Sequence, residues 1–320
     1  MDKFLMSLPD KTQYYCDKLD LDKYNITFTN KPYSKYINFR RRMNILFIKM
    51  KLPFIKGLIR RISKKVYDPK IVDAIINDTG LAIIDAYVNL DLLYLIKKYK
   101  PKRAFLLIWN PLSDKKAKLY KKYMRLENIY SYSIEESKKY NFNHFNDFYL
   151  MTYPYEKKPI VRDFYFLGRD KNRMELIEDF SKLIKDKYTY QFDIYTEFLE
   201  KRKFGNPLFN YFDEYLPFKD YLNRVFESRC IIDVNATSNI TFRTLEALIF
   251  EKKYICNNPN FKNMDFYNPN NILIIDEKTT LSDIDEFLEK PYIKIDFEIL
   301  KRYDVYTVYN NFKKKCEEIK

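Results

Sequence analysis

The sequence is poor in glycine, histidine and tryptophan, and the shortage of glycine excludes the most. Its 320 residues contain four glycines, Gly57, Gly80, Gly168 and Gly205, with one histidine and one tryptophan. Neither a G-x-G-x-x-G loop nor a Walker loop can be built from glycines so far apart. This disfavours nicotinamide-dependent enzymes of the usual type and P-loop kinases. A bound phosphate is therefore expected at a helix N-terminus that lacks a glycine loop.

Cysteine and histidine are too scattered to suggest a metal centre. The four cysteines, Cys16, Cys230, Cys256 and Cys316, form no C-x-x-C pair, and His144 is the only histidine. A zinc site is therefore disfavoured. The simplest interpretation is a reduced chain in the cytoplasm.

Long uncharged runs are missing as well. No uncharged stretch approaches the roughly 18–20 residues that span a bilayer. The apolar run at the N-terminus stops at Pro9, so we expect no secretory signal. The chain instead carries a net charge of +14, which implies an anionic partner. Nucleic acid, anionic lipid and a phosphorylated substrate all fit that charge.

The most basic segment is Phe39–Lys65, in which Lys and Arg are interleaved with apolar residues and no acid occurs. This pattern favours contact with an anionic membrane surface, where each basic residue contributes roughly 1 kcal/mol. The alternative is two short helices, separated at Pro53 and Gly57, that pack on a core with their charges in water. Nucleic-acid binding is the weakest interpretation, because few aromatic residues accompany the basic ones.

Short apolar runs alternate with helical patterns along the whole chain. The clearest expected strands are Phe4–Leu8, Leu81–Ile84, Arg103–Ile108, Arg162–Leu167 and Cys230–Asn235. Strand and helix in alternation predict parallel sheets with crossover helices. The length suits two domains, which we place at residues 1–155 and 156–300. Residues 301–320 form a terminal helical region, and an interdomain linker is expected near Tyr153–Pro159.

The segment that follows Cys230–Asn235 predicts an anion site. A polar loop leads to a helix expected at Thr241–Glu251, and Ser238 and Asn239 are good N-cap residues. Free N–H groups at a helix start favour negative charge. Arg243 adds a planar fork suited to phosphate. Asn235, at the strand end, is a further candidate. For Ser238 and Thr241 the alternative is ordinary helix capping.

A second loop of this kind follows Arg162–Leu167. Gly168 lets the backbone approach a ligand closely, and Arg169 can reach a phosphate. The alternative for Arg169 is a solvated loop charge. We expect both loops on the same edge of one sheet, because ligands of such sheets bind beyond the carboxyl ends of the strands.

Several runs in this half resemble GT-B glycosyltransferases of bacterial capsular polysaccharide and lipopolysaccharide biosynthesis. They are Phe164–Asp170, Leu245–Leu248, Lys252–Cys256, Asn263–Asn268 and Asn271–Ile272. The resemblance covers roughly residues 160–280 and extends to the N-terminal half only in outline. It implies an α/β fold of two Rossmann-like domains, with parallel sheets facing a cleft. It also implies that the last helix crosses back to the first domain.

The resemblance implies roles for individual residues of the donor domain. Glu246 would bind the ribose hydroxyls, and the helix start at Ser238–Thr241 would hold the diphosphate. The alternative for Glu246 is a surface carboxylate paired with Arg243 one turn earlier. Retaining members often carry a second acid at the position of Ser238, so this sequence does not support a retaining mechanism.

Acidic residues are the remaining candidates for metal binding and for the catalytic base. Asp20–Asp22 and Asp283–Asp285 match the D-x-D pattern that holds Mn²⁺ or Mg²⁺ in GT-A enzymes. Neither lies at the end of a strand in the expected donor domain, so we predict no metal and no other cofactor. An inverting transfer needs a base. Asp85, at a strand end, is the first candidate and Asp10 the second; His144 lies in a linker-like stretch and ranks below them.

The sequence thus predicts transfer of a sugar from a nucleoside diphosphate sugar to a glycan or lipid-linked glycan acceptor. The enzyme would be cytoplasmic, or peripheral at the inner face of the membrane through residues 39–65. The alternatives are a basic scaffold or nucleic-acid-binding protein without catalysis, and a sugar-nucleotide epimerase of GT-B shape. Steep salt dependence of nucleic-acid binding would favour the scaffold.

Overall fold

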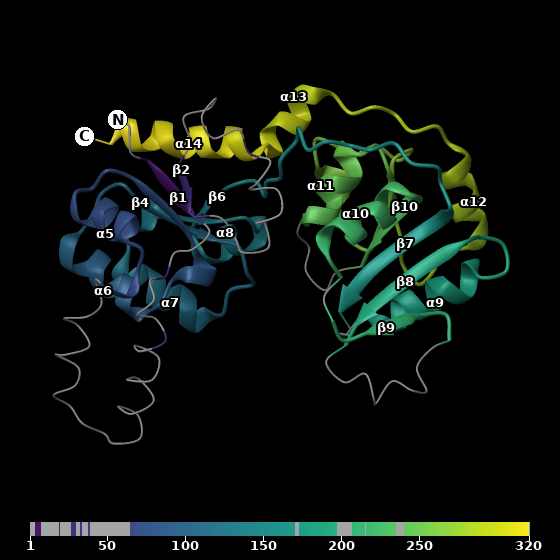
Figure 1. The fold of residues 1–320 in the computed structure, drawn as a ribbon, viewed down its shortest axis with the longest axis horizontal. Helices are drawn as coiled ribbons and strands as arrows, with labels where there is room; N and C mark the ends of the chain where they lie inside the picture. Colours follow the sequence, from purple (N-terminus) through teal and green to yellow (C-terminus); the bar gives the residue numbers. More distant parts are fainter. Residues whose placement is uncertain are drawn as a thin grey trace, which may run out of the picture. The chain divides into compact units, whose positions relative to one another are not determined.

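Buried aliphatic runs form the central strands of both halves of the chain. The computed structural model describes residues 4–7, 19, 27–29, 33, 38, 65–169, 173–196, 207–214, 216–234 and 240–319. These residues fall into two units, Met1–Asn146 with Val305–Lys320, and Asp147–Asp304. The boundaries lie at 146/147 and 304/305, beside the expected 155/156 and 300/301. Each unit is an α/β fold around one sheet (Figure 1).

The sheet of the first unit is entirely parallel. Its order is β2-β1-β3-β4-β5-β6. The strands are β1 (Leu5–Ser7), β2 (Thr27–Thr29), β3 (Leu81–Ile84), β4 (Ala104–Ile108), β5 (Ile129–Ser131) and β6 (Asn143–His144). The order reverses between β1 and β3, and ligands of open parallel sheets bind at such switch points. Every residue of β3 and β4 is buried, as expected for strands covered on both faces.

The helices of this unit begin where the sequence supplies caps. They are α5 (Pro69–Ile76), α6 (Leu90–Tyr99), α7 (Asp114–Tyr123), α8 (Ile134–Tyr140) and α14 (Val305–Glu318), with short 3₁₀ turns at η2 (Asp85–Tyr87) and η3 (Leu126–Asn128). Asp68, Asn89, Ser113 and Ser133 each accept a hydrogen bond from the first turn of the helix that follows. The expected strand–helix alternation is confirmed here.

The last helix, α14, belongs to the same unit as the first strands (Figure 1). The Phe312 ring lies 5.6 Å from the Phe105 ring and 5.0 Å from the Tyr130 ring. The Tyr309 hydroxyl donates to the Phe4 carbonyl at 2.9 Å. Residues three hundred positions apart in the sequence therefore share one core, which is the arrangement expected for the terminal helix.

The second sheet is also parallel, with the order β12-β11-β10-β7-β8-β9. Its strands are β7 (Arg162–Arg169), β8 (Tyr190–Tyr195), β9 (Asn210–Phe212), β10 (Ser228–Asp233), β11 (Lys253–Cys256) and β12 (Ile272–Ile274). The helices and 3₁₀ turns are α9 (Met174–Ile184), α10 (Phe218–Phe226), α11 (Phe242–Ile249), η5 (Pro259–Asn263), α12 (Leu281–Glu289), α13 (Phe297–Leu300) and η6 (Lys301–Tyr303). The switch point lies between β7 and β10.

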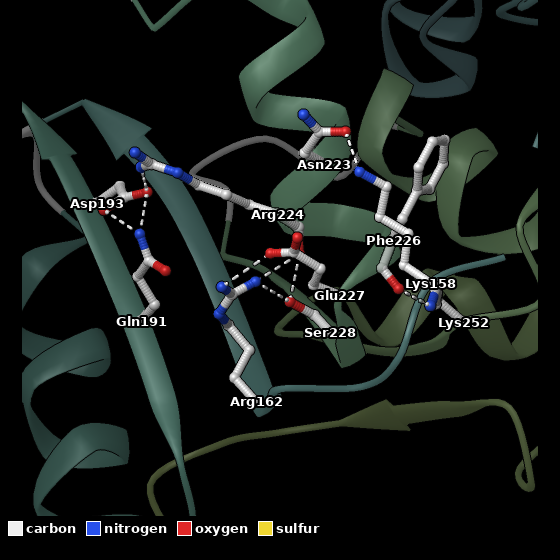
Figure 2. A network of polar contacts seen from close by, with 10 residues as sticks. All are labelled: Lys158, Arg162, Gln191, Asp193, Asn223, Arg224, Phe226, Glu227, Ser228 and Lys252. Atoms are coloured by element: carbon white, nitrogen blue, oxygen red, sulfur yellow. Dashed lines mark hydrogen bonds and ion pairs between the residues drawn. The ribbon is translucent and has the colours of Figure 1, made fainter. Parts of the chain in front are cut away.

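The two faces of this second sheet differ in chemistry. On one face, alternate strand residues such as Phe164, Phe192 and Ile232 form an apolar core with α9 and α12. On the other face, several intervening residues are polar or carry a hydroxyl group, among them Tyr165, Asp193 and Asp233. Figure 2 shows Arg224 of α10 paired with the buried Asp193 of β8, and Arg162 bonded to Glu227 at 3.2 Å. The Arg224–Asp193 pair joins α10 to the polar face, and the Arg162–Glu227 pair joins the start of β7 to the residue that caps α10.

One expectation about this part of the chain was wrong. The stretch around His144 is linker-like in sequence, but Asn143–His144 pairs with β5 as the edge strand β6. A two-residue strand is too short to display the alternation by which strands are recognised.

Candidate functional site

The candidate site lies at the carboxyl ends of β7 and β10, on either side of the switch point. The two strands are paired in parallel, with Ile232 opposite Phe166, so their ends at Arg169 and Asp233 meet at one edge. Two predicted donor ligands, Asn235 and Ser238, lie outside the described residues, as do Asp10 and residues 39–64 of the basic segment. The described residues of the site are built around Asp233.

Asp233 ends β10 and is 1% exposed. Its carboxylate accepts hydrogen bonds from the Thr241 hydroxyl, from the Tyr254 hydroxyl at 3.0 Å and from Arg243 Nη1 at 3.3 Å. A buried carboxylate needs such partners to offset its loss of water. Asp233 therefore fixes the side chains at the start of α11. Sequence reasoning missed it, although an aspartate within the apolar run of the expected strand Cys230–Asn235 was visible.

The helix α11 starts one residue later than expected, because the residue expected as its first, Thr241, is its N-cap. Thr241 is the N-cap, its Oγ1 accepts from the Thr244 amide at 3.4 Å, and Thr244 Oγ1 accepts from the Thr241 amide at 3.1 Å. The helix begins at Phe242, not at Thr241. The reciprocal pair explains the difference, because it satisfies two amides at once. The Arg243 amide has no hydrogen bond within the described part of the chain.

Two guanidinium groups converge beside Asp233. Arg173 Nη1 donates to the Val234 carbonyl at 2.9 Å, while Arg243 pairs with the carboxylate. Burial and the charge of Arg243 lower the pKa of Arg173. Burial acts to lower the pKa of Arg243, but neighbouring acidic groups, Asp233 first, outweigh it and raise that pKa. Guanidinium groups gathered at a strand end in this way are donors that suit an anion.

Arg173 was not among the predicted ligands, whereas Arg169 and Gly168 were. The Arg169 guanidinium lies 5.3 Å from the centre of the Tyr195 ring, at the ends of β7 and β8. A Cβ on Gly168 would lie 2.4 Å from Cζ of the buried Phe166, so packing against that ring already requires glycine there. The donor roles of Gly168 and Arg169 stay predictions. The signal for Arg173 was a second arginine four positions after Arg169.

Glu246 lies in the interior of the unit, 3% exposed, and accepts a hydrogen bond from the Tyr221 hydroxyl. Burial raises the pKa of Glu246 to about 7, although Tyr221 and Arg243 oppose that effect. The alternative of a surface carboxylate paired with Arg243 is wrong, because Arg243 pairs with Asp233. The ribose role of Glu246 stays a prediction.

Asp85, the first candidate for the base, follows β3 in the other unit. Its Oδ1 accepts from the Trp109 amide at 2.9 Å and from Asn110 Nδ2 at 3.0 Å. The residue is 4% exposed, and burial raises the pKa of its carboxyl group. A raised pKa is the direction of shift that favours a carboxylate as a proton acceptor. His144, by contrast, is exposed, and its Nε2 lies 3.2 Å from the Tyr132 carbonyl oxygen.

The D-x-D pair at Asp283–Asp285 has structural partners. Asp283 accepts from the Thr280 hydroxyl at 2.6 Å in the capping box of α12, and Asp285 pairs with Lys187 at 2.7 Å. Among the residues that the structure describes, no three potential metal-ligating side chains gather. None of the described helices has the length and apolar composition needed to cross a bilayer.

No family model matches the sequence, and no curated protein is significantly similar to it. Solved structures do share the fold. A glycosyltransferase from Rickettsia africae ESF-5 aligns over 100% of this chain and 99% of its own, with a TM-score of 0.56 and 13% identity. AviGT4, a glycosyltransferase involved in avilamycin A biosynthesis, aligns over 78% of this chain and 77% of its own, with a TM-score of 0.53 and 7% identity.

A third neighbour, the GtfA/B complex, has a TM-score of 0.46 at 10% identity; the match covers 74% of this chain but only 57% of that one. The first two likenesses establish the fold. The expected α/β architecture with two parallel sheets, of the kind found in GT-B glycosyltransferases, is confirmed.

Proposed function

We propose that the protein transfers a sugar from a nucleoside diphosphate sugar to a glycan acceptor, without a metal ion. One observation carries the proposal. Arg173 and Arg243 converge beside Asp233 at the switch point of the second sheet, next to the Arg243 amide, which donates no hydrogen bond to any described residue. Guanidinium groups and helix-start amides are the donors that a diphosphate binds. The fold shared with two glycosyltransferases supports the reaction class.

The proposed chemistry is a direct displacement. The acceptor hydroxyl oxygen forms a bond to the anomeric carbon, and the bond from that carbon to the diphosphate oxygen breaks. The electron pair of the broken bond stays on the diphosphate. Arg173 and Arg243 stabilise the added negative charge in place of a metal ion. The hydroxyl proton passes to a carboxylate, and Asp85 is the group we assign to accept it.

The remaining donor ligands and the acceptor are proposed on sequence grounds. Glu246 would bind the ribose, with Thr241 and the loop that contains Asn235 and Ser238 around the diphosphate. The acceptor would be a surface polysaccharide or lipopolysaccharide intermediate. Residues 39–65 carry ten basic residues and no acid, which supports a peripheral position on an anionic membrane.

A thermal-shift screen against UDP, GDP, CMP and their sugars tests the donor site. A ligand of the folded state at 100 times its Kd adds about 2.7 kcal/mol of stability, so a binder raises the Tm. We expect one nucleotide class to do so without added metal. Arg173→Met and Arg243→Met should each weaken its binding at least about 10-fold, the loss of one charge-assisted contact.

Arg229→Met is the matched control. Arg229 lies on the same strand as Asp233 but near its other end, with a 41% exposed side chain. Its substitution should leave nucleotide binding unchanged. If no nucleotide stabilises the protein, or if both site variants bind like the wild type, the proposed donor site is wrong.

A further inference from the structure

The loop between β4 and α7 lies at the carboxyl edge of the first sheet, beside Asp85. It contains Trp109, the single tryptophan of the chain, followed by Asn110 and Pro111. The Trp109 side chain is only partly buried. A large aromatic group left partly in water at this edge, where open parallel sheets bind ligands, calls for a functional explanation.

Hydrogen bonds hold this loop at both ends. At its start, the Trp109 amide and the Asn110 side chain donate to Asp85 Oδ1. Near its end, the Leu112 amide donates to Glu136 Oε1 at 2.7 Å, and the Leu112 carbonyl accepts from the Tyr140 hydroxyl at 3.3 Å. The loop is therefore preorganised by two neighbouring elements, η2 and α8, and does not depend on a ligand for its shape.

The indole itself is oriented by a ring contact. Its centre lies 6.1 Å from that of Phe145, at an interplanar angle of 66°. Beside it, the carbonyl oxygen of the Asn110 side chain accepts no hydrogen bond from any described residue. An oriented aromatic ring, an amide oxygen and a carboxylate thus lie together on one loop and the adjoining strand end.

We propose that Trp109 is the platform on which a sugar ring of the acceptor stacks. A pyranose presents a face of C–H groups with partial positive charge, which is attracted to the negative face of an indole. Its hydroxyl groups radiate from the ring edge, where Asn110 can donate or accept hydrogen bonds. This inference rests on the proposed function and names what that function leaves open, the residues that recognise the acceptor.

Because Trp109 is the only tryptophan, the tryptophan emission of the wild-type protein, excited selectively at the red edge where tyrosine does not absorb, reports on this loop alone. The probes are the methyl glycosides of glucose, galactose, mannose and N-acetylglucosamine, and disaccharides of these sugars, at up to about 100 mM. We expect at least one of them to change the emission saturably in the absence of any nucleotide. If no sugar of the panel changes the emission, the inference is overturned.

Saturation-transfer NMR with the same sugars gives an independent readout for variants. Trp109→Ala should weaken sugar binding at least about 10-fold, whereas Trp109→Phe, which keeps an aromatic face, should retain most of it. Tyr123→Ala, which removes a partly buried aromatic ring from α7 in the same unit, should bind sugar like the wild type. Binding to Trp109→Ala equal to that of the wild type would show that the ring has only a packing role.

The nucleotide thermal shift separates the two proposals and checks the fold of each variant. Trp109→Ala should keep the full nucleotide shift, because the donor site lies in the other unit. If the wild-type protein binds nucleotide but no sugar in either test, only the proposed role of Trp109 in acceptor binding is contradicted. A wild-type protein that binds no nucleotide contradicts the transferase proposal itself.

Discussion

At the scale of single residues, the second unit places charged and hydroxyl groups where an ordinary sheet face would be apolar. Asp193, Asp233 and Glu246 are each at most 3% exposed. Each is offset by a partner on a helix or a neighbouring strand: Arg224 for Asp193, Arg243 and Tyr254 for Asp233, and Tyr221 for Glu246. Polar groups without partners would cost several kcal/mol in such an interior, so these pairs determine how α10 and α11 can pack.

Glu246 leads to a prediction about pH. Its pKa is raised from 4.5 to about 7, so between these values the folded state keeps a proton that the unfolded state releases. Its contribution to stability is fully present below pH 4.5 and is lost as the pH rises through 7. Glutamine resembles the neutral form of glutamate. The free energy of unfolding of Glu246→Gln should therefore rise relative to that of the wild type over this range, by up to about 3 kcal/mol at pH 8.

Urea unfolding at pH 5 and pH 8 measures this difference. Glu289→Gln, which replaces an exposed carboxylate on α12, is the control. Its unfolding free energy should differ from that of the wild type by the same amount at both pH values. A Glu246→Gln protein that loses stability relative to the wild type at pH 8 would mean that the ionised carboxylate is needed in the fold.

At the scale of elements, α11 and α12 start in the same way but lie in different surroundings. Both have a threonine capping box, Thr241 with Thr244 and Thr280 with Asp283. Only Thr241 also donates to Asp233 at the switch point. The same local motif therefore has a purely structural role in α12 and an added positioning role in α11.

Replacing each cap by alanine separates these roles. Thr280→Ala and Thr241→Ala should each lower the free energy of unfolding by about 1 kcal/mol, with a further loss in Thr241→Ala for the bond to Asp233. Only Thr241→Ala should weaken nucleotide binding, because it releases the carboxylate that orients Arg243. Nucleotide affinity can be measured by calorimetry. Equal affinities in the two variants would show that Thr241 only caps the helix and does not position Arg243.

At the scale of the whole molecule, the chain forms two units, and its last helix belongs to the first of them. The Phe312 ring contacts Phe105, Tyr130 and Phe145, and Arg103 Nε donates to the Cys316 carbonyl at 2.9 Å. The core of the first unit is therefore incomplete until the end of the chain has been added.

Phe312→Ala should destabilise the first unit selectively. Removing a buried phenylalanine costs about 3–5 kcal/mol, so amide protons of β4 and β5 should exchange faster while those of β7 and β10 keep their protection. Hydrogen exchange followed by mass spectrometry resolves the two units. Phe297→Ala, at a site 56% exposed, is the control. Equal loss of protection in both units would show that they unfold as one.

The strand–helix alternation and the parallel sheets were predictable from the sequence. They depend on local patterns: buried runs such as Leu81–Ile84, and capping residues directly before helices. Even so, β6 was missed, because two residues are too few to show the alternation of apolar and polar residues that marks a strand. Arg173 was missed because its distance from Arg243 along the chain says nothing about their distance in space.

What the sequence alone determined is therefore the class of most elements and the edge of the sheet at which a ligand is expected. Apolar runs that form buried strands, and the residues that cap helices, act over a few positions and can be recognised directly in the sequence. Only the tertiary structure decided that Asp233 joins Arg243, Thr241 and Tyr254, that Glu246 points into the interior, and that α14 completes the first unit. Those facts depend on strand order and helix packing, which bring together residues that are far apart along the chain.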